Sequence, residues 1–368
     1  MVKQTAIRVI FLILVLLSCF GIGEIAAKAY YYLNPHWRDD PGSKYLIPNN
    51  SFSHWHPENF AGRSASESGE FDVTFHTNSF GMVDRERTLE KRGAVRIGLL
   101  GDSFVEGVQV EMHERFSDLL EKALSSETAK VEVLNFGCSW FSPLLERALY
   151  NHLAVHFRPD LVLVFVHFTD VTDNWTFRQQ AVFDQLGGLE RVRANSYLTS
   201  VRSPEADWLR ESSLIRLVYR GWQAYGALTN VRGPSLKENF GAWFKLKLNE
   251  DDRLALRFSE SNIAALVKSI RGSGSEVLLV GIPISQTITG SAKNRFVRQR
   301  LTSEQIHGAR QYYTWLQNLS GSLEVEYVDL LDAFIRSADR DRLFFPVDGH
   351  FTRYGHQVVA SVLQDILH

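Results

Sequence analysis

The sequence has almost no cysteine and almost no net charge. Cys19 and Cys138 are the two cysteines in 368 residues, one in an N-terminal apolar run and one deep in the chain. A disulfide between them is not expected, so the fold must depend on its core. Forty Lys and Arg against 42 Asp and Glu leave a formal net charge of −2, so no global field would attract nucleic acid. A composition of 45% hydrophobic and 22% charged residues excludes a disordered chain and suits one large domain with additions.

The sequence also lacks internal repeats and low-complexity tracts, and its long apolar run lies at the N-terminus. Lys3 and Arg8 precede the run from 9 to 23, a pattern typical of a targeting or anchoring element. Glu24 ends the run early for a spanning helix, although 25 to 27 could extend it. We favour an uncleaved signal anchor over residues 1–29. The alternatives are a signal peptide cut after Ala29 and a lipoprotein signal at Leu16-Leu17-Ser18-Cys19.

In all three cases the positive charge before the apolar run places the remainder of the chain across the membrane. Residues 30–70 follow, with four prolines, several aromatics and no sustained period of 2 or 3.6. This composition predicts a stalk and an irregular lead-in. A domain is expected over 71–368, and its chemistry should take place outside the cytoplasm.

From residue 95 the pattern becomes that of an α/β domain, because short apolar runs alternate with helical spacing. Strands are expected at 95–100, 131–136, 161–168, 276–282 and 325–330. Helices are expected at 116–124, 142–153 and 259–271, after the capping-box pattern Thr302-x-x-Gln305, and at 354–367. Residues 175–258 break this rhythm and are interpreted as an insertion with a helix near 212–225. The pattern predicts a doubly wound, five-stranded parallel sheet.

Two short segments could carry chemistry. Ser103 lies where the first strand ends and a helix begins, so its hydroxyl could project at the carboxyl edge of the sheet beside backbone N–H groups. Asp348 and His350 follow the last strand, and a carboxylate two residues from an imidazole can fix the tautomer of the ring. Each feature alone is ambiguous, because serine at such a junction is most often an N-cap and Asp-Gly usually marks a turn.

Together, Gly101-Asp102-Ser103-Phe104, Gly137, Asp170 and Asp348-x-His350 resemble the sequence blocks of the SGNH (GDSL-type) hydrolase superfamily. Residues 77–81 and Gly355-His356 also resemble bacterial membrane-anchored members, so the resemblance covers about 72–174 and 259–368. It implies a flavodoxin-like three-layer α/β/α fold and a serine esterase. Ser103 would attack the ester carbonyl, His350 would take its proton and Asp348 would orient His350. The backbone N–H groups of Ser103 and Gly137 would donate to the oxyanion.

One block departs from the family pattern. The family usually places Asn immediately before the Asp that ends the third strand, and its amide completes the oxyanion hole. Here that position is Thr169, and Asn174 lies one turn later. Losing an oxyanion donor typically lowers turnover by about 10²–10³. The chain is therefore an active enzyme that uses Thr169, an active enzyme that uses Asn174, or a slow or degenerate one; we favour activity because nucleophile, base and acid are retained.

The Asp-x-His spacing is similar to that of proteins that add or remove O-acetyl groups on bacterial exopolysaccharides such as alginate. This resemblance implies an acyl, most simply acetyl, ester on a cell-surface carbohydrate, either hydrolysed or transferred. Such a substrate suits the compartment that the N-terminal run predicts, that of a single-pass protein of the bacterial inner membrane with a periplasmic or extracellular catalytic domain. The alternative is a degenerate glycan-binding or assembly protein. Tryptophans of the insertion could stack on sugars, although core packing is the more common role: Trp175, Trp208, Trp222 and Trp243.

Other candidate residues indicate structural roles. His54 with His56, and His350 with His356, have no third ligand at a fitting spacing, so no metal and no cofactor are expected. His356 is expected to bond to backbone, and Cys138 to be a buried, inert thiol. Asp102 is expected to brace the turn before Ser103 through backbone hydrogen bonds.

Overall fold

The computed structural model describes residues 2–33, 45–66, 68–127, 130–194, 212–215, 217–218, 242–245, 247–289 and 302–367. The chain forms two compact units. The smaller unit comprises Met1–Asp40 and Thr199–Ser235, and the larger unit comprises Pro41–Leu198 and Leu236–His368.

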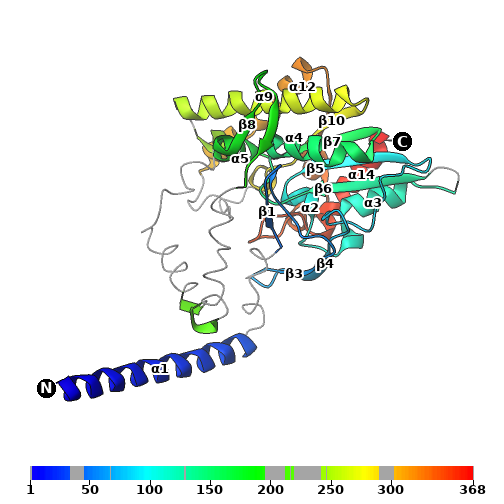
Figure 1. Cartoon of the computed structure of the whole chain (residues 1–368). Coiled ribbons are helices and arrows are strands. Elements are labelled where there is room, and N and C mark those ends of the chain that lie inside the picture. Colours follow the sequence, from blue (N-terminus) through cyan, green and yellow to red (C-terminus); the bar gives the residue numbers. More distant parts are fainter. Residues whose placement is uncertain are drawn as a thin grey trace. The chain divides into compact units, whose positions relative to one another are not determined.

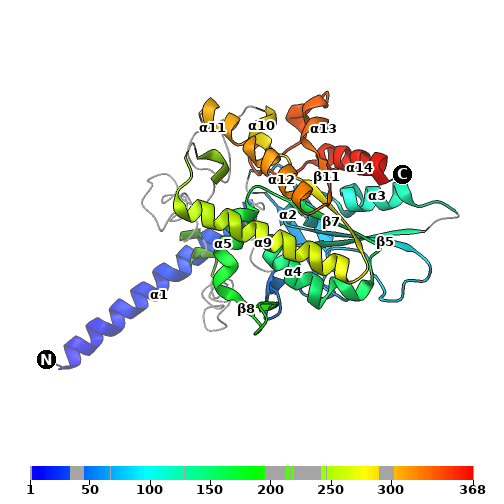
Figure 2. The ribbon, with the colours of Figure 1, turned by 90° about the horizontal axis from the view of Figure 1, so that it is seen from above.

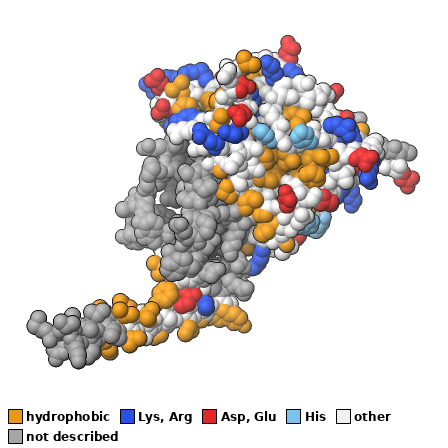
Figure 3. Space-filling view, in the orientation of Figure 1, with side chains coloured by type: hydrophobic (Ala, Val, Ile, Leu, Met, Phe, Trp, Pro, Cys, Tyr) orange, Lys and Arg blue, Asp and Glu red, His pale blue; other side chains and the backbone are white. Residues whose placement is uncertain are grey.

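The smaller unit contains one long helix, α1 (Val2–Leu33), drawn in blue in Figure 1. Its segment Phe11–Tyr30 has a mean hydropathy of 2.0 and is long and apolar enough to cross a membrane. Hydrophobic side chains are exposed along much of its length (Figure 3). A signal sequence would have the same length and composition, so the anchor over 1–29 stays a prediction.

Glu24 does not interrupt α1. Its carboxylate accepts hydrogen bonds from the N–H of Ser213 at 2.9 Å and of Leu214 at 3.0 Å, so it caps the helical turn 213–215. Residues 217–218 are also helical, and the rest of the helix expected near 212–225 lies outside the described residues.

The larger unit is built around a five-stranded parallel sheet. Its strands lie in the order β11-β10-β7-β5-β6. Numbered along the chain this is the flavodoxin-like order 2-1-3-4-5, whose chain reversal lies between β5 and β7. The strands confirm the five sequence-based assignments: β5 (Val95–Gly101), β6 (Val131–Gly137), β7 (Leu161–Val166), β10 (Glu276–Gly281) and β11 (Glu326–Asp329).

Helices cover both faces of the sheet, as the views of Figures 1 and 2 show. One face carries α3 (Phe116–Leu124) and α14 (Arg353–Leu367). The other carries α4 (Pro143–His152), α9 (Glu250–Gly272) and α12 (Gln311–Ser322). The three-layer α/β/α architecture expected from the resemblance is therefore confirmed.

Shorter elements complete the larger unit. The helices and 3-10 turns are α2 (Ser103–Glu106), η3 (Met112–Glu114), η4 (Ala154–Phe157), α5 (Asp170–Phe177), η5 (Arg178–Gln180), η8 (Ala242–Phe244), α10 (Ser285–Thr289), α11 (Ser303–Gly308), α13 (Leu331–Arg336) and η9 (Arg340–Arg342). The capping box expected before α11 is present, because Thr302 and Gln305 exchange side-chain to backbone hydrogen bonds.

The helix expected at 259–271 starts earlier than predicted. Asn249 and Asp252 form a second capping box, in which each side chain accepts the backbone N–H of the other residue. This box starts α9 at Glu250, so its first two turns lie inside the segment interpreted as an insertion.

The stalk predicted for 30–70 is wrong for residues 45–66, which belong to the larger unit. β1 (Ile47–Asn49) pairs with β2 (Ser53–Trp55), and β3 (Ala61–Ala65) pairs with β4 (Asp72–His76). Phe52 and Trp55 are buried against Phe141, which follows β6. The segment lacks a regular hydrophobic period because its buried apolar residues belong to strands that are too short to repeat a pattern.

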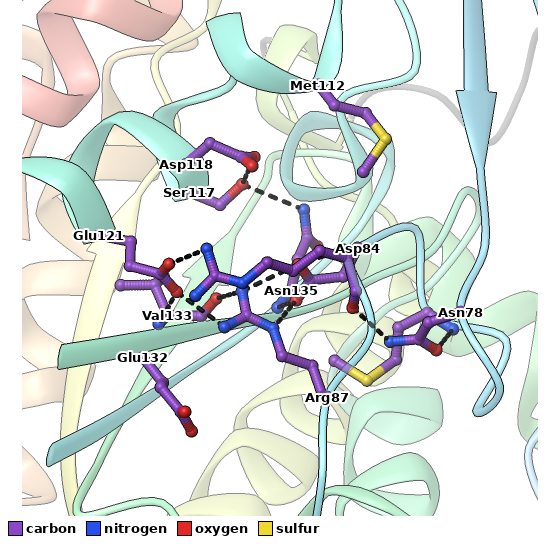
Figure 4. Close-up of polar contacts among 12 residues, drawn as sticks. Asn78, Asp84, Arg87, Met112, Ser117, Asp118, Glu121, Glu132, Val133 and Asn135 are labelled. Atoms are coloured by element: carbon purple, nitrogen blue, oxygen red, sulfur yellow. Dashed lines mark hydrogen bonds and ion pairs between the residues drawn. The ribbon is translucent and has the colours of Figure 1, made fainter. Parts of the chain in front are cut away.

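The lead-in is also joined to the start of the insertion and to the sheet. β8 (Ala181–Phe183) and β9 (Leu189–Val192) form a hairpin, and the N–H of Val192 donates to the carbonyl of Ser51 at 2.8 Å. Arg87, which lies between β4 and β5, bonds Asp84, Glu121 of α3 and the carbonyl of Val133 in β6 (Figure 4). These buried charge-assisted bonds fasten the segment before β5 to the sheet.

We expect Gly137→Ala to destabilise the larger unit. A Cβ at this position would overlap the backbone of α2, lying 2.6 Å from the carbonyl carbon of Val105 and also too close to the N–H of Glu106. The backbone cannot rotate away as a side chain could, so the free energy of unfolding should fall by about 1–3 kcal/mol. Urea unfolding would measure this loss. Gly321→Ala is the control, because its Cβ would enter open space in α12 and should be neutral or slightly stabilising. Equal midpoints for both variants would contradict the expectation.

Candidate active site

Ser103 begins a helix of one turn at the carboxyl end of β5. The carboxylate of Asp102 accepts the N–H of Phe104 at 2.9 Å and so caps α2, as the sequence predicts. The helix ends at Gly107, whose φ of +67° lies in the left-handed region that glycine adopts readily. The hydroxyl of Ser103 is thereby held on a rigid, part-buried turn at the edge of the sheet where ligands bind in this type of fold.

The structure brings His350 and Asp348 to Ser103 from the other end of the chain. The Oγ atom of Ser103 lies 2.7 Å from Nε2 of His350, and Nδ1 of His350 lies 2.5 Å from Oδ1 of Asp348. A carboxylate can only accept, so Nδ1 carries the hydrogen and Nε2 is left to accept from the serine hydroxyl. This is the hydrogen-bond chain of a nucleophile, a base and an orienting acid.

The loop that carries His350 is closed by its own backbone. The N–H of Phe345 donates to the carbonyl of His350, and the N–H of Gly349 donates to the carbonyl of Phe345, each at 2.9 Å. Gly349 has a φ of +88°, which requires glycine between the acid and the base.

Glu70 holds the same loop from outside. Its two carboxylate oxygens accept the N–H groups of Val347 and Asp348, both at 2.8 Å. Ser68 donates to the same carboxylate at 2.7 Å, and Phe71 contacts Phe345 with ring centroids 5.1 Å apart. Sequence reasoning missed Glu70, since it lies in the segment interpreted as a stalk and no local motif marks it.

The predicted oxyanion donors differ in whether they already have a hydrogen-bond acceptor. In the part of the chain that the structure describes, the N–H of Ser103 has no hydrogen-bond acceptor. The N–H of Gly137 donates to the side-chain oxygen of Asn135 at 2.9 Å. The hydroxyl of Thr169 lies 2.8 Å from Nδ1 of His167 and is also hydrogen-bonded to Asp173. Gly137 and Thr169 would therefore have to change or share partners to donate to substrate.

Asn174 is held in other contacts, so we favour Thr169 over Asn174 as an oxyanion donor. Its side chain is fully buried. The amide oxygen accepts the N–H of Leu144 at 2.9 Å, and the amide nitrogen donates to Ser259 at 3.0 Å. Asn174 thus joins α4, α5 and α9 behind the site, a structural role that spacing alone could not distinguish.

Three buried carboxyl groups lie close enough to Asp102, the residue before Ser103, for their charges to interact. Glu146, Asp170 and Asp173 are at most 8% exposed, and burial followed by the charges of neighbouring acids raises the pKa of each well above its ordinary value. Among the described residues, both oxygens of Glu146 and Oδ1 of Asp170 have no hydrogen-bond partner. Burial without such partners therefore favours the protonated, neutral form of these groups.

Two groups of side chains bring potential metal ligands within 4.8 Å of one another: Asp102 with His167 and Asp170, and His56 with Glu106 and Cys138. In the second group His56 already bonds Glu106 at 2.6 Å, and burial raises the pKa of the Cys138 thiol, so no thiolate is present. In the first, Nδ1 of His167 lies within hydrogen-bond distance of Thr169 and near Asp102. The absence of a metal stays a prediction.

Several structural roles predicted from the sequence are confirmed. His356 is buried and its Nδ1 accepts the N–H of Phe116 at 3.3 Å, while burial lowers its pKa to about 3. His54 bonds the carbonyl of Ser139 at 2.8 Å, and Cys138 is buried. Trp175 packs against Phe258 and Arg178, and Trp243 is buried against Tyr312 and Trp315; Trp208 and Trp222 lie outside the described residues.

Comparisons with known proteins agree with this geometry. A sequence model described as the GDSL-like lipase/acylhydrolase family matches residues 99–358, which include Ser103, Asp348 and His350. The comparison with curated proteins gave no match. A solved lipase/acylhydrolase from Enterococcus faecalis aligns with 11% identity and a TM-score of 0.41, over 74% of this chain and 95% of its own.

Two further solved structures are similar at the same low level. A variant of an acetyl-xylooligosaccharide esterase from Geobacillus has 12% identity and a TM-score of 0.40, over 75% of this chain and 95% of its own. A GDSL-like lipase from Bacteroides thetaiotaomicron has 10% identity and a TM-score of 0.38, over 76% and 91%.

We expect Glu146→Gln to stabilise the protein at neutral pH. The raised pKa means that the folded chain keeps a proton which the unfolded chain releases above the ordinary value of 4.5. Stability is therefore lost as the pH rises above that value, and no loss exists below it. A neutral amide removes this loss, so the thermal midpoint should rise at pH 7–8 and show no gain near pH 4. Exposed Glu58→Gln is the control. A destabilisation of equal size at every pH would instead indicate an ionised carboxylate held by a cation.

We expect Glu70→Ala to lower kcat for an ester substrate about 10- to 100-fold with little change in KM, because the loop carrying Asp348 and His350 loses its external support. Glu70→Gln keeps one acceptor oxygen and should lose less. Glu90→Ala, which removes an exposed carboxylate bonded to Arg92, should retain wild-type kcat. Steady-state kinetics distinguishes these results, and a Glu70→Ala enzyme with unchanged kcat would show that the loop holds its own geometry.

Proposed function

We propose, from the premise that the chain belongs to the GDSL-like lipase/acylhydrolase family and is an ester-hydrolysing enzyme, that it acts through an acyl-enzyme on Ser103. The observation that carries the proposal is the chain of hydrogen bonds from Ser103 through His350 to Asp348. These atoms already have the contacts that proton transfer requires, within 2.5–2.7 Å.

In the first step Ser103 Oγ attacks the ester carbonyl carbon and its proton moves to Nε2 of His350. The C–O bond to the alcohol then breaks, and His350 returns that proton to the departing oxygen. In the second step water, or a sugar hydroxyl, gives its proton to His350 and attacks the acyl group, which restores the Ser103 hydroxyl. Asp348 keeps the imidazole oriented and stabilises its positive charge in both steps.

The oxyanion is stabilised first by the N–H of Ser103, which no described residue occupies. We assign supporting roles to Gly137 and Thr169, whose present partners are Asn135 and Asp173. Two donors in competition with existing hydrogen bonds imply a weak oxyanion hole and a slow enzyme. The same observation favours the second candidate, a degenerate protein that binds glycan without cleaving it.

For the substrate we propose an acetyl ester on a cell-surface carbohydrate, hydrolysed or transferred. The support is the Asp348-x-His350 spacing and the apolar helix α1, which would tether the protein to a bacterial inner membrane with the catalytic unit on the periplasmic or outer side. Neutral acetyl esters of glycans would meet the enzyme in that compartment.

We expect the full-length protein in detergent to hydrolyse p-nitrophenyl acetate and Ser103→Ala to abolish the activity. Thr169→Asn should raise kcat, by at most the 10²–10³-fold attributed to one oxyanion donor, since an amide reaches further than a hydroxyl. A fluorophosphonate probe should label the wild type and fail on His350→Ala. Folded wild-type protein that neither labels nor hydrolyses the ester, yet binds glycan, would support the degenerate alternative, and labelling that survives Ser103→Ala would refute the assigned nucleophile.

A further inference from the structure

Trp140 has an unusual backbone and an unusual exposure. Its φ is +68°, in the left-handed region that bulky L residues rarely adopt. Its side chain is 50% exposed, whereas the neighbouring residues Cys138 and Phe141 are fully buried. Neither property helps folding, because the backbone is strained and the apolar ring remains in water. Strained residues of this kind cluster at active sites and ligand clamps.

The loop that carries Trp140 adjoins the turn that carries Ser103. Gly101 at the end of β5 is the register partner of Gly137 at the end of β6, and the N–H of Cys138 donates to the carbonyl of Gly101 at 3.2 Å. One residue before Trp140, the hydroxyl of Ser139 donates to Glu106 at 2.5 Å. Glu106 is the last residue of the one-turn helix that Ser103 begins, so the two loops lie side by side at the carboxyl edge of the sheet.

A buried polar network holds Trp140 in this conformation. Glu106 bonds both Ser139 and Nε2 of His56, the latter at 2.6 Å, while Nδ1 of His56 lies 2.9 Å from the carbonyl of Gly81. His54 bonds the carbonyl of Ser139 at 2.8 Å, and burial lowers its pKa to about 4, so it stays neutral. His54, His56 and Glu106 are at most 1% exposed. Two of these hydrogen bonds end on Ser139, one at its hydroxyl and one at its carbonyl, so the network supports the Ser139–Trp140 loop.

We propose that Trp140 is a preformed platform on which one pyranose ring of the acylated substrate stacks while its ester reaches Ser103. This inference rests on the proposed function and names the part of the substrate that is recognised. A half-exposed indole offers one apolar face with its rim in water, which matches a pyranose with a face of C–H groups and hydroxyls around its edge. Because the backbone of Trp140 is already held in place, less conformational entropy is lost when a sugar binds to its indole ring.

The test compares two acetyl esters that differ in the ring. Glucose pentaacetate carries acetyl groups on a pyranose, and glycerol triacetate carries them on an open chain. Trp140→Gly should lower kcat/KM for glucose pentaacetate about tenfold, the factor that about 1.4 kcal/mol represents. It should change kcat/KM for glycerol triacetate less than threefold. Trp140→Phe should lie between, and Phe183→Ala, which removes another exposed ring, should match the wild type.

Trp140→Gly should not impair folding, because glycine adopts the left-handed conformation without strain. The thermal midpoint should therefore rise or stay unchanged. Equal losses on both esters would overturn the proposal by placing Trp140 in the chemistry. Unchanged kinetics, or a loss confined to p-nitrophenyl octanoate, would overturn it in favour of no contact or of an acyl pocket.

A binding measurement keeps this inference separate from the proposed function. In a Ser103→Ala background, saturation-transfer NMR should detect glucose pentaacetate on the protein, and adding Trp140→Gly should remove the signal. This result, combined with no hydrolysis by the wild type, would refute the proposed esterase function and support sugar binding at Trp140. Hydrolysis that depends on Ser103, with an NMR signal unaffected by Trp140→Gly, would refute sugar binding at Trp140 and support the esterase function.

Discussion

The close approach of α2 to the end of β6 is the constraint on which the site depends. Gly137 has no Cβ, so the backbone at Val105 and Glu106 lies directly against it. Asn135, two residues earlier on β6, donates to the carbonyl of Val105 at 2.8 Å and accepts the N–H of Gly137. One packed contact therefore fixes the turn that carries Ser103 and brings Glu106 beneath the Ser139–Trp140 loop. It also explains why Gly137 has a structural role whether or not it contacts an oxyanion.

Two buried ionisable side chains, Arg96 and Glu146, differ in how well their polar atoms are satisfied. Arg96 is fully buried, yet its guanidinium donates to Glu132 and to the carbonyls of Phe157 and Thr88, so its desolvation is offset. Glu146 is equally buried behind the nucleophile and has no such partner among the described residues. The first arrangement stabilises the domain. The second is expected to lower stability at neutral pH, and it lies close enough to Asp102, the residue before Ser103, for the two charges to interact.

The five strands and the turn that carries Ser103 could be predicted because each depends on local sequence. An apolar run needs only its own residues to indicate a buried strand, and the Gly101-Asp102-Ser103 turn follows from one strand end and one cap. The contributions of Glu70 and Trp140 could not be predicted. Glu70 acts through two backbone N–H groups 277 and 278 residues away, and Trp140 is distinguished by a backbone angle. The contacts of Asn174 likewise could not be predicted, because its partners come from α4 and α9.

The segment before β5 makes contacts around the site that the sequence patterns did not predict. The family match begins at residue 99, after all of it. Yet Glu70 from this segment supports the loop of His350, and His54 and His56 support the loop of Trp140, so two sides of the site rest on residues outside the matched domain. Both supports consist of hydrogen bonds to backbone or to a buried carboxylate, which fix position without entering the reaction. The region that matches the family contains Ser103 and His350, and the segment before β5 supplies hydrogen bonds that hold the loops around them.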